Sequence, residues 1–267
     1  MRDLLNQRIC MRGIDRSIIV YNMPKRLSVI PSRAMFIFLF LSLGLSVYSQ
    51  SGKDSVVKSP FSVNFDVVSR YIWRALPSSQ SPAFQPSVGY SNNGFSFGTW
   101  GSYTFAKEAI QEVDLYVGYS KGRFSLTIND YYSPIDTVII GDYFEWDAKK
   151  SRHVIEPLLT IDGPLAFQLV GAIMLYGNDR DMDGDNNYST YFELNKIWSK
   201  NGITVKPYIA ITTGTGYYSS DGLQVVNAGI DFKKSCKINS DFQLPVGVNF
   251  ITNPYKKTVF LVLSVSF

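Results

Sequence analysis

Beyond residue 60, apolar and polar residues alternate one by one along the chain. From Phe61 to Val67 every second residue is aromatic or β-branched, and the residues between them are Ser, Asn and Asp. The pattern returns at 95–105, at 242–250 and at 259–267. Because successive side chains of a strand point to opposite faces, this period predicts strands with one apolar and one polar face. No comparable helical stripe interrupts it, so we expect an all-β protein.

The pattern predicts about twelve strands, joined alternately by short turns and longer loops. The turn at 92–94 is short, whereas 133–152 and 178–187 are long, and residues 142–149 fall in the longest loop. This alternation is typical of a transmembrane up-and-down antiparallel β-barrel, whose even number of strands returns the chain to its starting side. The expected strands are 61–74, 82–91, 94–105, 110–120, 122–132, 153–162, 165–177, 188–198, 203–213, 223–234, 240–251 and 257–267.

A soluble β-sandwich or a lipocalin-like barrel would show the same period with its apolar face turned inward. Three features favour the membrane barrel instead: a predicted export signal, a polar face rich in small residues, and aromatic residues near strand ends. The aromatic residues in question are Tyr71, Trp73, Tyr90, Tyr103 and Trp198.

Residues 1–50 have the pattern of a leader with a signal peptide. The run Phe36–Tyr48 has 13 residues without a charge, and basic residues precede it. Val47 and Ser49 suit the −3 and −1 positions of a cleavage site. The alternative is a transmembrane anchor, but a helix of this length spans only about 20 Å of a roughly 30 Å hydrocarbon core. We therefore expect export.

The end of the predicted leader sets the limits of the segments that follow it. Residues 51–60 are a short polar segment, and 61–267 form the expected barrel domain. The n-region is unusually long, which is compatible with translation starting at Met23 or Met35. No cysteine stands at the cleavage point, so we expect no lipid anchor.

The net charge of +4 belongs to the leader. Residues 1–50 hold seven basic and two acidic side chains, which leaves 19 basic and 20 acidic ones in the remainder. This balance removes the main support for nucleic-acid binding. With one histidine and two cysteines, Cys10 and Cys236, the chain is poorly supplied for a zinc cluster or a Cys/His catalytic centre.

The stretch 69–132 carries a family resemblance. It opens with Ser-Arg-Tyr-Ile-Trp-Arg at 69–74, continues with Ser-Pro-Ala-Phe-Gln-Pro at 81–86 and Gly-Thr-Trp-Gly-Ser at 98–102, and reaches Glu-Val-Asp-Leu-Tyr-Val-Gly-Tyr at 112–119. This order resembles the TorF-like outer-membrane porin family, whose members are small, signal-bearing proteins described as β-barrels. The resemblance implies a porin-like role without a substrate. Ala75 departs from the family pattern, which has glycine after the arginine.

If the apolar stripes face lipid, the opposite stripes line the lumen. This arrangement predicts six acids and three bases inside, whose opposed charges would form a constriction that screens solutes. The alternative is a network of pairs that plugs the interior. The predicted pore-lining residues are Asp66, Arg70, Arg74, Glu112, Asp114, Glu156, Glu193, Lys206 and Asp231.

The loop 178–190 resembles the start of a calcium-binding loop. Asp179, Asp181, Asp183 and Asp185 place carboxylates at alternate positions, with a glycine for the turn. The twelfth position is Thr190 instead of the bidentate glutamate, and no helices flank the loop. We expect an acidic, solvated outer loop, with weak Ca²⁺ binding as the alternative and no other cofactor.

His153 is the only histidine and stands at the outer end of a strand. A barrel hydrolase would use such a residue in a Ser/His pair, but no serine motif accompanies it. We expect a surface residue and no enzyme activity.

Together these features predict an exported outer-membrane barrel of about 12 strands. Its partners would be outer-membrane lipid and the small solutes or ions that diffuse through it. The alternatives are a plugged structural or adhesion barrel that binds through its outer loops, and a barrel hydrolase.

Overall fold

In the computed structural model, residues 59–105, 111–133, 142–240 and 242–267 are described. The predicted leader, 1–50, and all but the last two residues of the polar segment 51–60 lie outside them.

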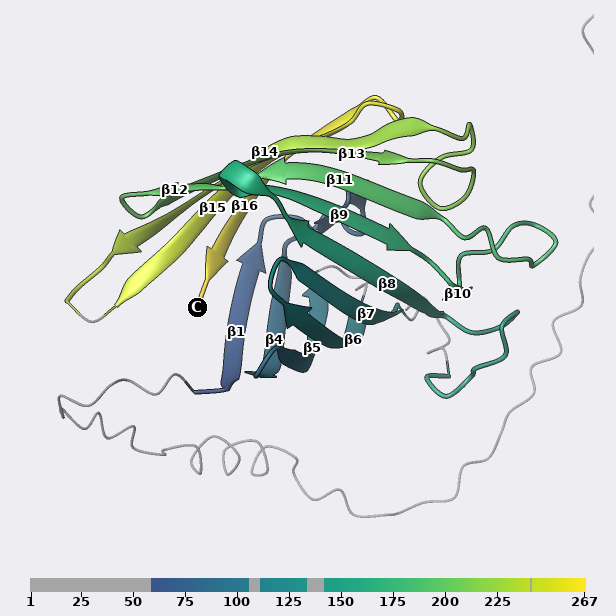
Figure 1. Cartoon of the computed structure of the whole chain (residues 1–267), viewed down its shortest axis with the longest axis horizontal. Helices are drawn as coiled ribbons and strands as arrows, with labels where there is room; N and C mark the ends of the chain where they lie inside the picture. The colour runs from purple at the N-terminus through teal and green to yellow at the C-terminus, as the bar shows by residue number, and fades with distance from the viewer. Residues whose placement is uncertain (1–58, 106–110, 134–141, 241) are drawn as a thin grey trace, which may run out of the picture. The chain divides into compact units, whose positions relative to one another are not determined.

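Twelve strands of the described part form a closed antiparallel barrel (Figure 1). Each strand pairs with its neighbours in chain order, and the last strand, β16, pairs with β1 to complete the ring. The predicted all-β, up-and-down barrel is thereby confirmed. The strands are β1 (Phe61–Val68), β4 (Ala83–Asn92), β5 (Phe95–Thr104), β6 (Gln111–Lys121), β7 (Phe124–Tyr132), β8 (His153–Asp162), β9 (Phe167–Ile173), β11 (Thr190–Lys196), β13 (Ile203–Thr212), β14 (Gln224–Lys237), β15 (Gln243–Asn253) and β16 (Thr258–Ser266).

Further short strands lie at the ends of the barrel. β10 (Tyr176–Gly177) pairs with β8, and β12 (Trp198–Lys200) pairs with β13. β2 (Ile72–Trp73) and β3 (Leu76–Pro77) pair only with each other among the described strands. A 3₁₀ turn covers Pro164–Ala166. None of the helical structure in the described residues is long and apolar enough to cross a membrane.

The apolar face of the sheet points outward. On β1, Phe61, Val63, Phe65 and Val67 are 38–64% exposed, whereas Asp66 on the opposite face is half-buried. The other strands continue this exposed row with residues that include Val88, Phe97, Val117, Leu126, Leu169, Leu194, Ile209, Phe232, Phe250 and Leu261. The arrangement is the reverse of a lipocalin-like barrel, in which the apolar face would line the interior.

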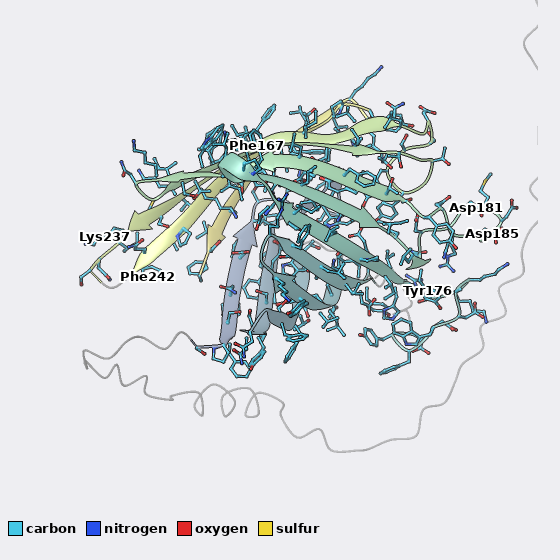
Figure 2. The ribbon with its side chains drawn as sticks, in the orientation of Figure 1. Phe167, Tyr176, Asp181, Asp185, Lys237 and Phe242 are labelled. Atoms are coloured by element: carbon cyan, nitrogen blue, oxygen red, sulfur yellow. The ribbon has the colours of Figure 1, made fainter. Side chains whose placement is uncertain are left out.

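Short turns and long loops lie at opposite ends of the barrel. The turn between β4 and β5 has positive φ angles at Asn93 (49°) and Gly94 (85°), the two residue types that adopt this conformation most easily. In Figure 2, Lys237 and Phe242 lie at the short-turn end, and Asp181 and Asp185 lie at the long-loop end. Phe267, the last residue, exchanges backbone hydrogen bonds with Phe65.

The prediction of one strand over 61–74 is wrong, because β1 ends at Val68. The chain then turns into the barrel, and we call residues 69–82 the inward segment. Its bend lies at Arg74 and Ala75, whose φ angles are 48° and 60°. Ala75 is 1% exposed and packs against Ile251 and Val262. The bend therefore forms with alanine in place of the glycine of the family pattern, in a left-handed conformation that alanine adopts only at a cost.

Candidate functional site

A bidentate ion pair crosses the lumen. Arg74 Nη1 lies 2.6 Å from Glu156 Oε1, and Nη2 lies 2.8 Å from Oε2. Glu156 is fully buried, and the Arg74 side chain is 10% exposed. Parallel N–H···O bonds of this kind fix both groups in one geometry. The pair joins the inward segment to β8 on the barrel wall.

Two tyrosine hydroxyls form hydrogen bonds with this ion pair. Tyr131 on β7 donates to Glu156 Oε2 at 2.9 Å, and Arg74 donates to the hydroxyl of Tyr218. Tyr218 belongs to the loop between β13 and β14 and is 1% exposed. Burial raises the pKa of Tyr218 well above its ordinary value, so the phenol stays neutral. The network thus ties the inward segment, β7, β8 and the loop between β13 and β14 together.

Aromatic rings enclose the guanidinium. Arg74 Cζ lies 4.5 Å from the Trp73 ring centroid and 4.2 Å from that of Tyr191. Trp73 in turn packs on Tyr131, Tyr217 and Tyr218. Cation–π contacts strengthen when they are shielded from water. We call Trp73, Arg74, Tyr131, Glu156, Tyr191 and Tyr218 the clasp.

A second contact ties the inward segment to β6. The Tyr71 hydroxyl donates to Glu112 Oε1 at 3.1 Å, and Ser133 Oγ donates to Glu112 Oε2 at 3.3 Å. Burial and the negative charge of Glu112 raise the pKa of Tyr71 well above its ordinary value. Tyr71 therefore remains a donor. Asp114 lies two residues along the same face, and its buried Oδ1 has no hydrogen-bond partner within the part of the chain that the structure describes.

A third polar group lies on β11 and β13. Lys206 Nζ is 3.2 Å from Glu193 Oε1, and Tyr191 donates to Glu193 Oε2 at 2.7 Å. Asp231 on β14 lies 3.7 Å from Lys233 Nζ, whose side chain is 61% exposed. Each of these charges has an opposite charge nearby.

Cavities lie along the described part of the lumen. One of about 100 Å³, near the long loops, is lined by residues including Trp73, Glu112 and Arg152. A second of about 350 Å³ is lined partly by Arg74 and Lys206. A third of about 220 Å³ lies beside Arg70. Because Trp73 lines the first cavity and Arg74 the second, the clasp separates them.

The nine residues predicted to line a pore are distributed over this interior. Seven lie on strands, at positions opposite the exposed apolar rows, and the inward segment carries Arg70 and Arg74. The structure brings Arg74 to Glu156, Lys206 to Glu193, and Asp66 and Arg70 to the same cavity as Asp231. Glu112 and Asp114 lie side by side near Tyr71.

The aromatic members of the clasp were not predicted from the sequence. Tyr71 and Trp73 were expected near strand ends, as aromatic residues of a membrane barrel, but both lie inside the barrel. Tyr218 follows Gly214 and Gly216 in a segment with the composition of a flexible outer loop. Its burial depends on contacts with Trp73 and Arg74, which are far away in sequence and leave no local signal.

Comparison with known families identifies the chain. Residues 53–265 match the model of a family described as a bacterial protein of unknown function, Gcw_chp. The chain belongs to the Gcw_chp family. The match covers nearly all of the described barrel and assigns no porin function. No curated protein matches the chain.

In this Gcw_chp member, the acidic loop uses its carboxylates to hold its own backbone. Asp179 is 2% exposed and accepts hydrogen bonds from the Ser189 backbone N–H at 2.7 Å and from its hydroxyl at 2.8 Å. Asp181 accepts from the backbone N–H groups of Asp183 and Asp185, both at 2.9 Å. Among the described residues, no group of three or more His, Cys, Asp or Glu side chains is arranged to hold a metal.

The prediction that His153 is a surface residue is wrong. The side chain is fully buried because residues 142–152 fold over it. Its Nδ1 lies 2.8 Å from Asp130 Oδ1, its Nε2 lies 2.7 Å from the Tyr143 carbonyl oxygen, and its ring stacks on Trp146. Both nitrogens are thus occupied, and neither faces a serine hydroxyl.

Proposed function

We propose that this Gcw_chp barrel lies in the bacterial outer membrane and lets small solutes or ions diffuse through its lumen. The observation that carries the proposal is the direction of the alternation: the exposed face is a continuous band of Phe, Leu, Ile and Val. A band of this size is an aggregation hazard in water, whereas hydrocarbon solvates it. A closed ring also pairs every strand edge, as a bilayer requires.

Two features of the sequence support this location. The run Phe36–Tyr48 has the form of a signal for export. The order of motifs over residues 69–132 resembles the TorF-like outer-membrane porins. Outer-membrane lipid and small solutes are the partners that this proposal implies, and the near-neutral charge of the barrel gives nucleic acid no basic surface.

The polar face of the lumen supports passage of small polar solutes. Charged residues such as Lys206 and Glu193, which pair with each other, would line the path and screen solutes by size and charge. The clasp narrows this path where Arg74 meets Glu156. We infer that transport is slow while the clasp is closed and faster when Arg74 moves away.

The clasp also favours a second candidate, a plugged barrel that binds partners through its long loops. In that role Arg74 and Glu156 would be permanent structural partners. We assign no catalytic role, since both nitrogens of His153 are already bonded, and we propose no resident cofactor.

Liposome swelling tests the proposal. Residues 51–267 would be refolded into vesicles, and light scattering would follow the uptake of small solutes of graded size. We expect slow but size-dependent swelling. Protein that inserts without any swelling would favour the plugged barrel, and protein that stays in water as a folded barrel would overturn the membrane location.

A further inference from the structure

The cavity below the clasp has the size of a ligand site. Its volume is about 350 Å³, compared with about 100 Å³ for the cavity beside Glu112 and about 220 Å³ for the cavity beside Arg70. Small-molecule sites generally occupy roughly 300–1,000 Å³. Ile72, Leu158 and Ile251 form an apolar part of its wall, and Lys206 and Asn227 belong to its polar part.

Asn227 lines this cavity and carries a buried acceptor that no described residue uses. The residue is 5% exposed, and its Nδ2 donates to the Tyr191 hydroxyl at 2.8 Å. Tyr191 itself donates to Glu193, so its oxygen must accept, which fixes the orientation of the amide. The remaining atom, Oδ1, is buried and has no hydrogen-bond partner among the described residues. A buried acceptor in this state is costly until a donor reaches it.

The charges around the cavity are already neutralised. Glu193 pairs with Lys206 at 3.2 Å, and Arg74 is committed to Glu156. Asp231 has Lys233 at 3.7 Å. A charged ligand would have to displace one of these partners, whereas a neutral ligand with hydroxyl groups would not.

We propose that this cavity binds a small neutral polyhydroxylated solute of monosaccharide size. One hydroxyl donates to Asn227 Oδ1, others donate to Asp231 and accept from Lys206, and the C–H face lies against Ile72 and Ile251. The inference rests on the proposed function, because the solute reaches the cavity through the lumen.

Saturation-transfer NMR with D-glucose tests the site on residues 51–267 refolded in detergent micelles. We expect saturable binding that glucose 6-phosphate and lysine do not reproduce. Asn227→Leu should weaken binding about tenfold, as expected for a lost hydrogen bond to a buried group. The matched control Asn92→Leu, at the exposed end of β4, should bind as the unmodified protein does.

A second variant covers the case in which Asn227→Leu fails to fold. Asp231→Asn keeps the side-chain shape and should weaken glucose binding a few fold. Equal binding by all variants, or a preference for a charged solute, would overturn the site. Vesicles that swell while glucose binding is absent would also overturn it and leave the channel standing. Glucose binding without swelling would support the site and remove the channel.

Discussion

On the inner face of the sheet, two glycines leave room for the side chain of Tyr116. The Tyr116 side chain lies over Gly98 and Gly89. A Cβ at Gly98 would lie 2.3 Å from the Val88 carbonyl oxygen and 2.5 Å from the Tyr116 hydroxyl. The first of these atoms is backbone and cannot move without shifting the strand.

Gly98→Ala should therefore lower the free energy of unfolding by about 1–3 kcal/mol, the usual cost of overpacking. Urea titration of the refolded barrel measures it. Gly214→Ala is the matched control, because nothing lies within 4 Å of a Cβ there. Equal effects of the two changes would contradict this account of the inner surface.

Most of the strands were predictable from the sequence, and the one wrong strand prediction, 61–74, has a local cause. Eleven expected strands agree in position with the observed ones to within a few residues, because both faces of the sheet are patterned. The inward segment continues the period of two through Trp73, and its bend at Arg74–Ala75 lacks the Gly or Asn that marks a turn. The two-residue period alone also does not determine whether the apolar or the polar face of the sheet points outward.

His153 organises an element that periodicity cannot predict, the loop segment 142–152. His153→Ala removes hydrogen bonds to Asp130 and to the Tyr143 carbonyl, so we expect the segment to detach. Trypsin cleavage after Lys149 and Lys150 should accelerate about tenfold or more while the barrel stays folded. Phe144→Ala, which changes a side chain that is 79% exposed, should leave cleavage unchanged. Unchanged cleavage in His153→Ala would refute this role.

Asp179 has the corresponding role in the loop 178–190. Asp179→Ala leaves the Ser189 N–H and hydroxyl without their acceptor, so trypsin should cleave faster after Arg180. Asp183→Ala, at an exposed position, is the control. We expect Ca²⁺ to leave these rates unchanged, because Asp179 and Asp181 already accept backbone hydrogen bonds. Protection by Ca²⁺ that is lost in Asp183→Ala would instead support the calcium loop.

At the scale of the whole molecule, the clasp joins the inward segment to the barrel wall inside the lumen. Arg74 and Glu156 were both predicted to face inward, but their pairing depends on the fold of the inward segment. Removing Arg74 alone would leave a buried carboxylate unpaired, at a cost of about 3–5 kcal/mol. A variant that removes both partners avoids this cost.

Single-channel recording in planar bilayers is the most direct test of a membrane channel narrowed by the clasp. The unmodified protein, residues 51–267, should insert and give small, discrete conductance steps. The double variant Arg74→Ala/Glu156→Ala should give steps several times larger, with insertion unchanged. Inserted protein that stays silent in both forms would contradict the account.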